Sequence, residues 1–175
     1  IGILYEHIEE YNNALNTYTG IRDNIPENNY IKIFENYIDI ARVYLRMKNE
    51  DEARKYFEKA KTIIEKEPSL TTIDFYERVA ETYEQLRIYK YAIENYKIAY
   101  ELMNEADIEN RVDNLYKRSV LYEIIGKLDD AVEICLEAID ITGENRYVTL
   151  WKLYNRLGKL YTEYRDYEAS LEAYK

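Results

Sequence analysis

The sequence predicts an all-α protein, a solenoid of antiparallel helix pairs that repeat every 39 residues. Tyrosine marks this period, because it recurs without insertion or deletion at Tyr5, Tyr44, Tyr83, Tyr122 and Tyr161. Glycine and proline are scarce, with five and two residues among 175, which is too few for a β protein with many turns. Hydrophobic residues make up 47% of the chain, enough to form a core.

Small residues occupy two fixed positions of every repeat. The first position lies three residues before the marker tyrosine and the second lies nine residues after it. The two sets are Gly2, Ala41, Ala80, Ser119 and Gly158, and Ala14, Ala53, Ala92, Ala131 and Ser170. Because a large side chain would hold two packed helices apart, we expect the helices of each pair to cross here. Close approach also explains Gly158, which stands in a helical pattern at a cost of about 1 kcal/mol.

The register of the repeat places the elements in order along one domain, residues 1–175. About four and a half repeats are predicted: a partial unit over 1–27, units over 33–68, 71–106 and 110–143, and a partial unit over 147–175. The second helix of the second unit is expected to run from Glu50 to Glu67 and to stop at Pro68. Since both ends cut through a repeat, we expect a fragment of a longer chain.

The residues of this register resemble the tetratricopeptide repeat. The pattern Tyr154-x2-Leu157-Gly158-x2-Tyr161 followed by Ser170-x3-Tyr174 is similar to that family's consensus, and Leu115-x2-Arg118-Ser119-x2-Tyr122 followed by Ala131-x3-Cys135 is the weakest copy. The family's usual unit has about 34 residues, so this is a long-helix variant. The resemblance implies a right-handed superhelix. Coiled coils and HEAT or armadillo repeats fit the period and the paired small residues less well.

Composition argues against several functions. A net charge of −10 disfavours nucleic acids and anionic membranes as partners, and no run of 18 apolar residues occurs. The chain has one histidine, His7, and one cysteine, Cys135, which fills a core position of the repeat. We therefore expect no catalytic site, no metal and no cofactor, and a cytoplasmic location.

The resemblance implies that the first helix of each pair lines a concave face that binds partners. Candidate residues on that face are Arg42, Arg46, Arg78, Tyr116, Lys117, Asn155, Arg156 and Lys159. Arg78, Lys117 and Arg156 form a basic ladder with one residue per repeat. Local i,i+4 pairs with Asp74 and Asp113 are the alternative for the first two residues, but Arg156 has Lys152 at that spacing. Some members of this family bind the C-terminal carboxylate of chaperones with Lys, Asn and Arg side chains from three successive repeats. The corresponding positions of this sequence do not carry that set of residues.

These features predict a protein-interaction scaffold that binds a peptide or protein segment in its concave groove. The basic ladder predicts a partner segment with spaced acidic residues. Two alternatives stay open: a ligand- or peptide-sensing domain that controls an attached effector, and an architectural array that self-associates through its ends.

Overall fold

The computed structural model describes residues 1–67, 69–144 and 146–175, and in these residues it contains helices and no strands. It divides into two compact units, Ile1–Asn95 and Tyr96–Lys175, which are described separately below. The all-α class is confirmed. Pro68, the predicted helix stop, lies outside the described residues.

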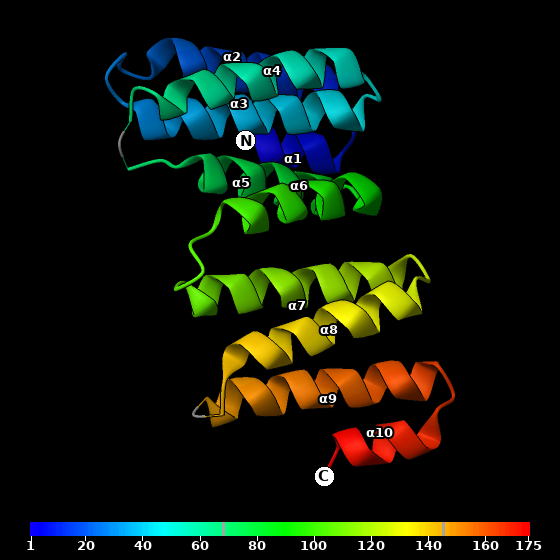
Figure 1. Cartoon of the computed structure of the whole chain (residues 1–175). Coiled ribbons are helices and arrows are strands. Elements are labelled where there is room, and N and C mark those ends of the chain that lie inside the picture. The colour runs from blue at the N-terminus through cyan, green and yellow to red at the C-terminus, as the bar shows by residue number, and fades with distance from the viewer. Residues whose placement is uncertain (68, 145) are drawn as a thin grey trace. The chain divides into compact units, whose positions relative to one another are not determined.

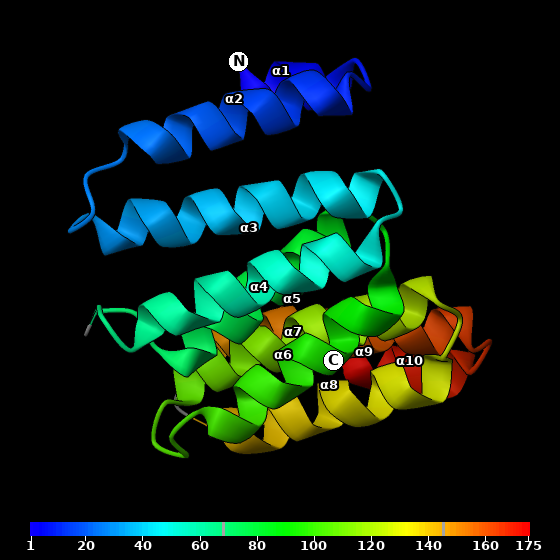
Figure 2. The same cartoon turned by 90° about the horizontal axis from the view of Figure 1, so that it is seen from above.

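Unit 1 contains consecutive antiparallel helices (Figures 1 and 2). They are α1 (Gly2–His7), α2 (Tyr11–Asn24), α3 (Tyr30–Arg46), α4 (Glu50–Ile64), α5 (Thr72–Gln85) and the first half of α6 (Tyr89–Leu102). The helix predicted over Glu50–Glu67 begins as expected but ends at Ile64, because the amides of Lys66 and Glu67 turn back onto the carbonyl of Ile63.

Unit 2 contains the rest of α6, followed by α7 (Ile108–Ile124), α8 (Leu128–Thr142), α9 (Tyr147–Glu163) and α10 (Tyr167–Ala173). Helices α7 and α8 pack along most of their length, and α9 packs against both α8 and α10 (Figure 1). Among the described residues, no helix has the length and apolar character that a membrane span requires.

Local sequence explains where several helices begin. Asn29, Asn49, Asp107 and Asp166 each accept a hydrogen bond from the backbone amide three residues further on, in the first turn of the following helix. Thr71 and Asp74 form a reciprocal capping box at the start of α5. Short polar side chains of this kind satisfy amides that have no partner within the helix.

The turn between the two helices of a pair has the same geometry in all five copies. One residue in each turn is left-handed, with φ between 59° and 76°: Glu9, Lys48, Arg87, Gly126 and Arg165. In each copy the next amide donates to the marker tyrosine's carbonyl, as Asn49 does to Tyr44 over 2.9 Å. This is a Schellman turn, and it fixes where the first helix ends and the second begins.

The predicted crossing positions lie in the core. The alanines among them are fully buried, and Gly2, Gly158, Ser119 and Ser170 are also buried. In unit 1, Ala41 and Ala53 belong to one cluster with Phe57 and residues of α3 and α5. In unit 2, Ser170 donates from its Oγ to the Gly158 carbonyl over 2.9 Å, so the two backbones approach closely. The predicted reason for small residues at these positions is confirmed.

Candidate functional site

The first helices of unit 1 are joined by a buried carboxylate that the sequence analysis did not identify. Glu6 of α1 is only 4% exposed. It accepts hydrogen bonds from Arg42 Nη2 at 2.9 Å, from Arg46 Nε at 3.1 Å, and from the Tyr18 hydroxyl at 2.8 Å. Two of the candidate binding residues, Arg42 and Arg46, therefore connect α3 to α1.

The charges of this cluster shift the pKa values of its members. Burial raises the pKa of Glu6, but the hydrogen bonds and positive charge of Arg42, together with Tyr18 and Arg46, outweigh burial and hold the pKa below its ordinary value. Asp39 also pairs with Arg42, at 2.8 Å, yet burial and the nearby charges of Glu6 and Glu35 raise the pKa of Asp39. Arg42 therefore serves two carboxylates and is not an unpaired cation.

Arg78 lies on the exposed surface of α5 and pairs with a different residue from the one expected. Its Nη1 lies 3.2 Å from Glu81 Oε2, one turn further along the helix. Asp74, the expected partner, is instead bound to the backbone amide and hydroxyl of Thr71 in the capping box. The pairing of Arg78 with Asp74 is therefore wrong, because a carboxylate in the first turn is better placed to satisfy free amides.

Lys117 and Tyr116 lie on α7 in unit 2. Lys117 Nζ lies 3.1 Å from Asp113 Oδ2, which is the i,i+4 pair expected from the sequence. The ring of Tyr116 is contacted from α9, where Lys152 Nζ lies 4.1 Å from the ring centroid. This distance is typical of a cation–π contact.

Arg156 has no partner on its own helix, as predicted, but it is paired across the repeat. Its side chain is 8% exposed, its Nη1 donates to Glu123 of α7, and its Nε lies 3.3 Å from Ser119 Oγ. The i,i+4 spacing used in the sequence analysis compares residues of one helix. It cannot detect this pair, because Glu123 precedes Arg156 by 33 residues. Arg156 is thus an inter-repeat contact, equivalent in role to Arg42 and Arg46.

Asn155 and Lys159 complete the predicted set. Asn155 is half-buried and lines a cavity of about 560 Å³ between α9 and α10, with Trp151 and Tyr154 as its aromatic wall. Lys159 is exposed. Lys152, Asn155, Arg156 and Lys159 follow the spacing i, i+3, i+4 and i+7, so they share one side of α9.

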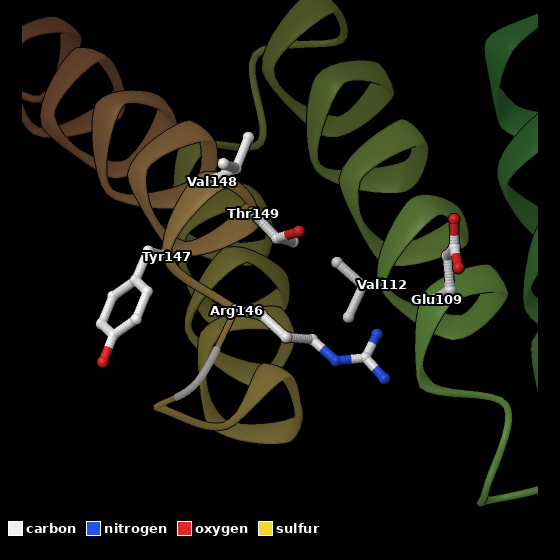
Figure 3. A pocket seen from close by; sticks show the side chains of 6 residues that line it. All are labelled: Glu109, Val112, Arg146, Tyr147, Val148 and Thr149. Atoms are coloured by element: carbon white, nitrogen blue, oxygen red, sulfur yellow. The ribbon is translucent and has the colours of Figure 1, made fainter.

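A second cavity lies between the N-terminal ends of α7 and α9. It has a volume of about 520 Å³ and was not predicted (Figure 3). The Arg146 side chain extends from the start of α9 toward Val112 and Glu109 on α7, while Tyr147 points away (Figure 3). Within the described residues no group of three His, Cys, Asp or Glu side chains could hold a metal ion here or elsewhere.

Unit 2 therefore presents what we call the basic face: Tyr116 and Lys117 of α7 with Lys152, Asn155, Arg156 and Lys159 of α9. Four of these residues are cations: Lys117, Lys152, Arg156 and Lys159. Two carboxylates pair with them, Asp113 with Lys117 and Glu123 with Arg156. The chain as a whole carries a net charge of −10, so this face differs in charge from the chain's average.

Comparison with known proteins identifies the class. Residues 34–67 and 112–145 match a family described as tetratricopeptide repeat. The second match begins 78 residues after the first, which is two periods of 39. These two segments therefore match tetratricopeptide repeats, and such repeats generally serve as protein-interaction scaffolds.

Solved structures with the same fold span nearly the whole chain. A putative kinesin light chain from Podosopora anserina with nearly identical TPR-like repeats has a TM-score of 0.61 at 14% identity, covering 98% of this chain and 87% of that one. MamA has a TM-score of 0.56 at 17% identity, covering 99% and 90%. YrrB, described as a TPR protein with an unusual peptide-binding site, has a TM-score of 0.54 at 19% identity, covering 98% and 78%. No curated protein sequence matches this chain.

Proposed function

We propose that the chain is a non-enzymatic scaffold that binds an extended or helical segment of another protein along its first helices. The observation that carries this proposal is the basic face of unit 2. It combines an aromatic ring, an amide and an excess of cations on the first helices of two successive repeats. First helices supply the partner-binding surface in proteins of this class. The single cysteine, Cys135, which is free and buried, supports a cytoplasmic location.

The partner that fits the basic face is a segment with spaced acidic residues. Packed helices lie about 8–10 Å apart, and an extended chain advances about 3.3 Å per residue. Carboxylates about three residues apart could therefore reach α7 and α9 in turn. Because exposed ion pairs are weak, this surface would tune selectivity and the rate of association more than affinity.

The structure determines which residues a test should change. Arg156 is a poor choice, since its charge is paired in the core of the unit. Lys152 and Lys159 are exposed, so the double variant Lys152→Glu/Lys159→Glu should leave the fold intact. A matched control, Lys97→Glu/Lys127→Glu, reverses two exposed lysines that lie outside the first helices of the same unit.

The experiment measures binding of a fluorescent peptide with Asp at every third position. We expect the basic-face variant to weaken binding by roughly 2- to 30-fold, from two exposed pairs, and the control to leave it unchanged. An equal loss in both variants would mean that only total charge matters. Unchanged binding by the basic-face variant would remove this face from the proposal.

Self-association is a second candidate, and exposed apolar side chains on the terminal helix pairs favour it. Ile3, Leu4 and Ile8 are exposed at α1, and Trp151 and Leu171 are exposed at α9 and α10. Exposed apolar patches of this kind often mark protein contacts. Sedimentation velocity over a hundredfold range of concentration tests this candidate, and a constant monomer would exclude it.

A further inference from the structure

Unit 1 carries a groove between α3 and α5 that differs in charge from the basic face of unit 2. Two adjoining cavities of about 240 and about 200 Å³ share Glu35, Arg78 and Glu81 in their walls. Buried Phe34 and Ile38 supply an apolar floor. We call this surface the α3–α5 groove.

The rim of the α3–α5 groove is acidic. Its carboxylates are Glu35, Asp39, Asp74, Glu77 and Glu81, and its cations are Arg42 and Arg78. Both cations are already engaged, Arg78 with Glu81, and Arg42 with Asp39 and with Glu6 of α1. Even without Glu77, the four carboxylates Glu35, Asp39, Asp74 and Glu81 outnumber the two arginines, so the groove keeps an excess of negative charge.

The pKa of Asp39, which lines the groove, responds in part to the neighbouring carboxylates. The pKa of Asp39 is raised by burial, and the negative charges of Glu6 and Glu35 raise it further, although Arg42 acts in the opposite direction. Burial is the largest of these causes, and the smaller contributions of Glu6 and Glu35 are the ones that reflect neighbouring negative charge. An incoming cation would offset the repulsion between these carboxylates.

We propose that the α3–α5 groove binds a protein segment in which lysine or arginine alternates with apolar residues. This proposal depends on the proposed function in one respect, namely that the chain is a scaffold that binds other proteins. Lysine and arginine have long apolar stems that can lie on Phe34 and Ile38 while their charged ends reach the rim. Arginine can also donate two parallel hydrogen bonds to one carboxylate. The two units then select segments of opposite charge.

The test compares two twelve-residue peptides on the full chain. One has Arg at every third position with Leu and Ser between, and its twin has Glu in place of every Arg. The groove variant is Glu35→Gln/Glu81→Gln, which changes the two carboxylates that line both cavities. The control is Glu58→Gln/Glu65→Gln, which removes the same charge from exposed positions on α4 and at its C-terminal cap. Fluorescence anisotropy at 50 and 200 mM salt gives the dissociation constants.

We expect the basic peptide to bind the unmodified chain and to lose roughly 2- to 30-fold in affinity with the groove variant, with little loss in the control. Ile31→Ser, which removes an apolar side chain from the groove wall, should weaken the same peptide without changing charge. The Glu35→Gln single variant repeats the test if the double variant melts early.

Three results would overturn the proposal: no binding of the basic peptide, equal losses in groove and control variants, or full affinity in Ile31→Ser. The Glu-containing twin separates this proposal from the previous one. Its binding should respond to Lys152→Glu/Lys159→Glu and not to the groove variant, so either surface can fail while the other stands.

Discussion

The backbone of Gly158 lies directly against the ring of Tyr174. A Cβ atom built on Gly158 would lie 2.5 Å from Tyr174 Cζ, and a Cβ on Gly2 would lie 2.6 Å from Cζ of Tyr18 in the first pair. Sixteen residues separate the members of each contact. Where the first position is Ala41 or Ser119, the second is the less extended Phe57 or Cys135. In the remaining copy, Ala80 precedes Tyr96 by the same 16 residues, so a tyrosine at the second position does not by itself require glycine at the first.

We expect Gly158→Ala to lower the free energy of unfolding of unit 2. The overlap with Tyr174 costs about 1–3 kcal/mol by overpacking, which exceeds the gain in helix propensity of about 1 kcal/mol. In a Tyr174→Leu background the overlap is gone, so the same substitution should become stabilising. Thermal and urea unfolding of the four proteins of this cycle measure the coupling. A cycle without a change of sign would show that the ring moves aside at no cost.

We expect Lys48→Gly to stabilise unit 1 by up to about 1 kcal/mol. Lys48 has φ of 59°, and a side chain is disfavoured in that conformation. The fourth turn supplies the reverse experiment, since Gly126 has φ of 76° with open space around its Cα. Gly126→Ala should therefore destabilise unit 2 through backbone strain alone. Urea midpoints that move in the same direction for both variants would contradict this account of the turn.

The contact of Glu6 with Arg42 and Arg46 predicts a dependence of stability on pH. Because the pKa of Glu6 is lowered by folding from about 4.5, its contribution is fully present above that value and is lost as the pH falls through the folded pKa. Glu6→Gln should cost about 1.5–3 kcal/mol at pH 7, the usual size of a hydrogen bond to a charged group. The cost should shrink below about pH 4.

Asp39 should show the opposite trend. Its pKa is raised by folding, so its contribution is present at low pH and is lost as the pH rises through the folded pKa. The stability of Asp39→Asn relative to the unmodified protein should therefore improve as the pH rises from 3 to 7. Chemical denaturation at pH 3, 5 and 7 distinguishes the two residues, and parallel profiles for both variants would refute the assignment.

Cys135 should be unreactive in the folded chain. Burial raises the pKa of its thiol to about 11, although the charge of Arg156 acts in the opposite direction. At pH 8 the smaller thiolate fraction alone should slow reaction with a disulfide reagent on the order of 100-fold relative to the unfolded chain. Absorbance after mixing with the reagent, with and without urea, measures the ratio. Reaction at similar rates would mean that α8 opens readily.

The sequence by itself determined the repeat and the chemistry of its core. A period of 39 with two small positions predicted the all-α fold, the helix pairs and the reason for Gly158, because these follow from residues in one repeat that recur in every other. It also identified the Asp113–Lys117 pair, whose members are one helical turn apart. The Gly2–Tyr18 and Gly158–Tyr174 spacing was present in the sequence, but its meaning required the contact.

Only the tertiary structure decided what the charged residues do. Arg42 and Arg46 reach Glu6, and Arg156 reaches Glu123, across 33 to 40 residues of sequence. Such partners meet because successive first helices pack side by side, and spacing along one helix cannot reveal them. The same packing gathers five carboxylates at the α3–α5 groove, where the sequence had suggested a basic ladder. Packing positions repeat with the sequence, whereas surface charges acquire partners only when the repeats stack.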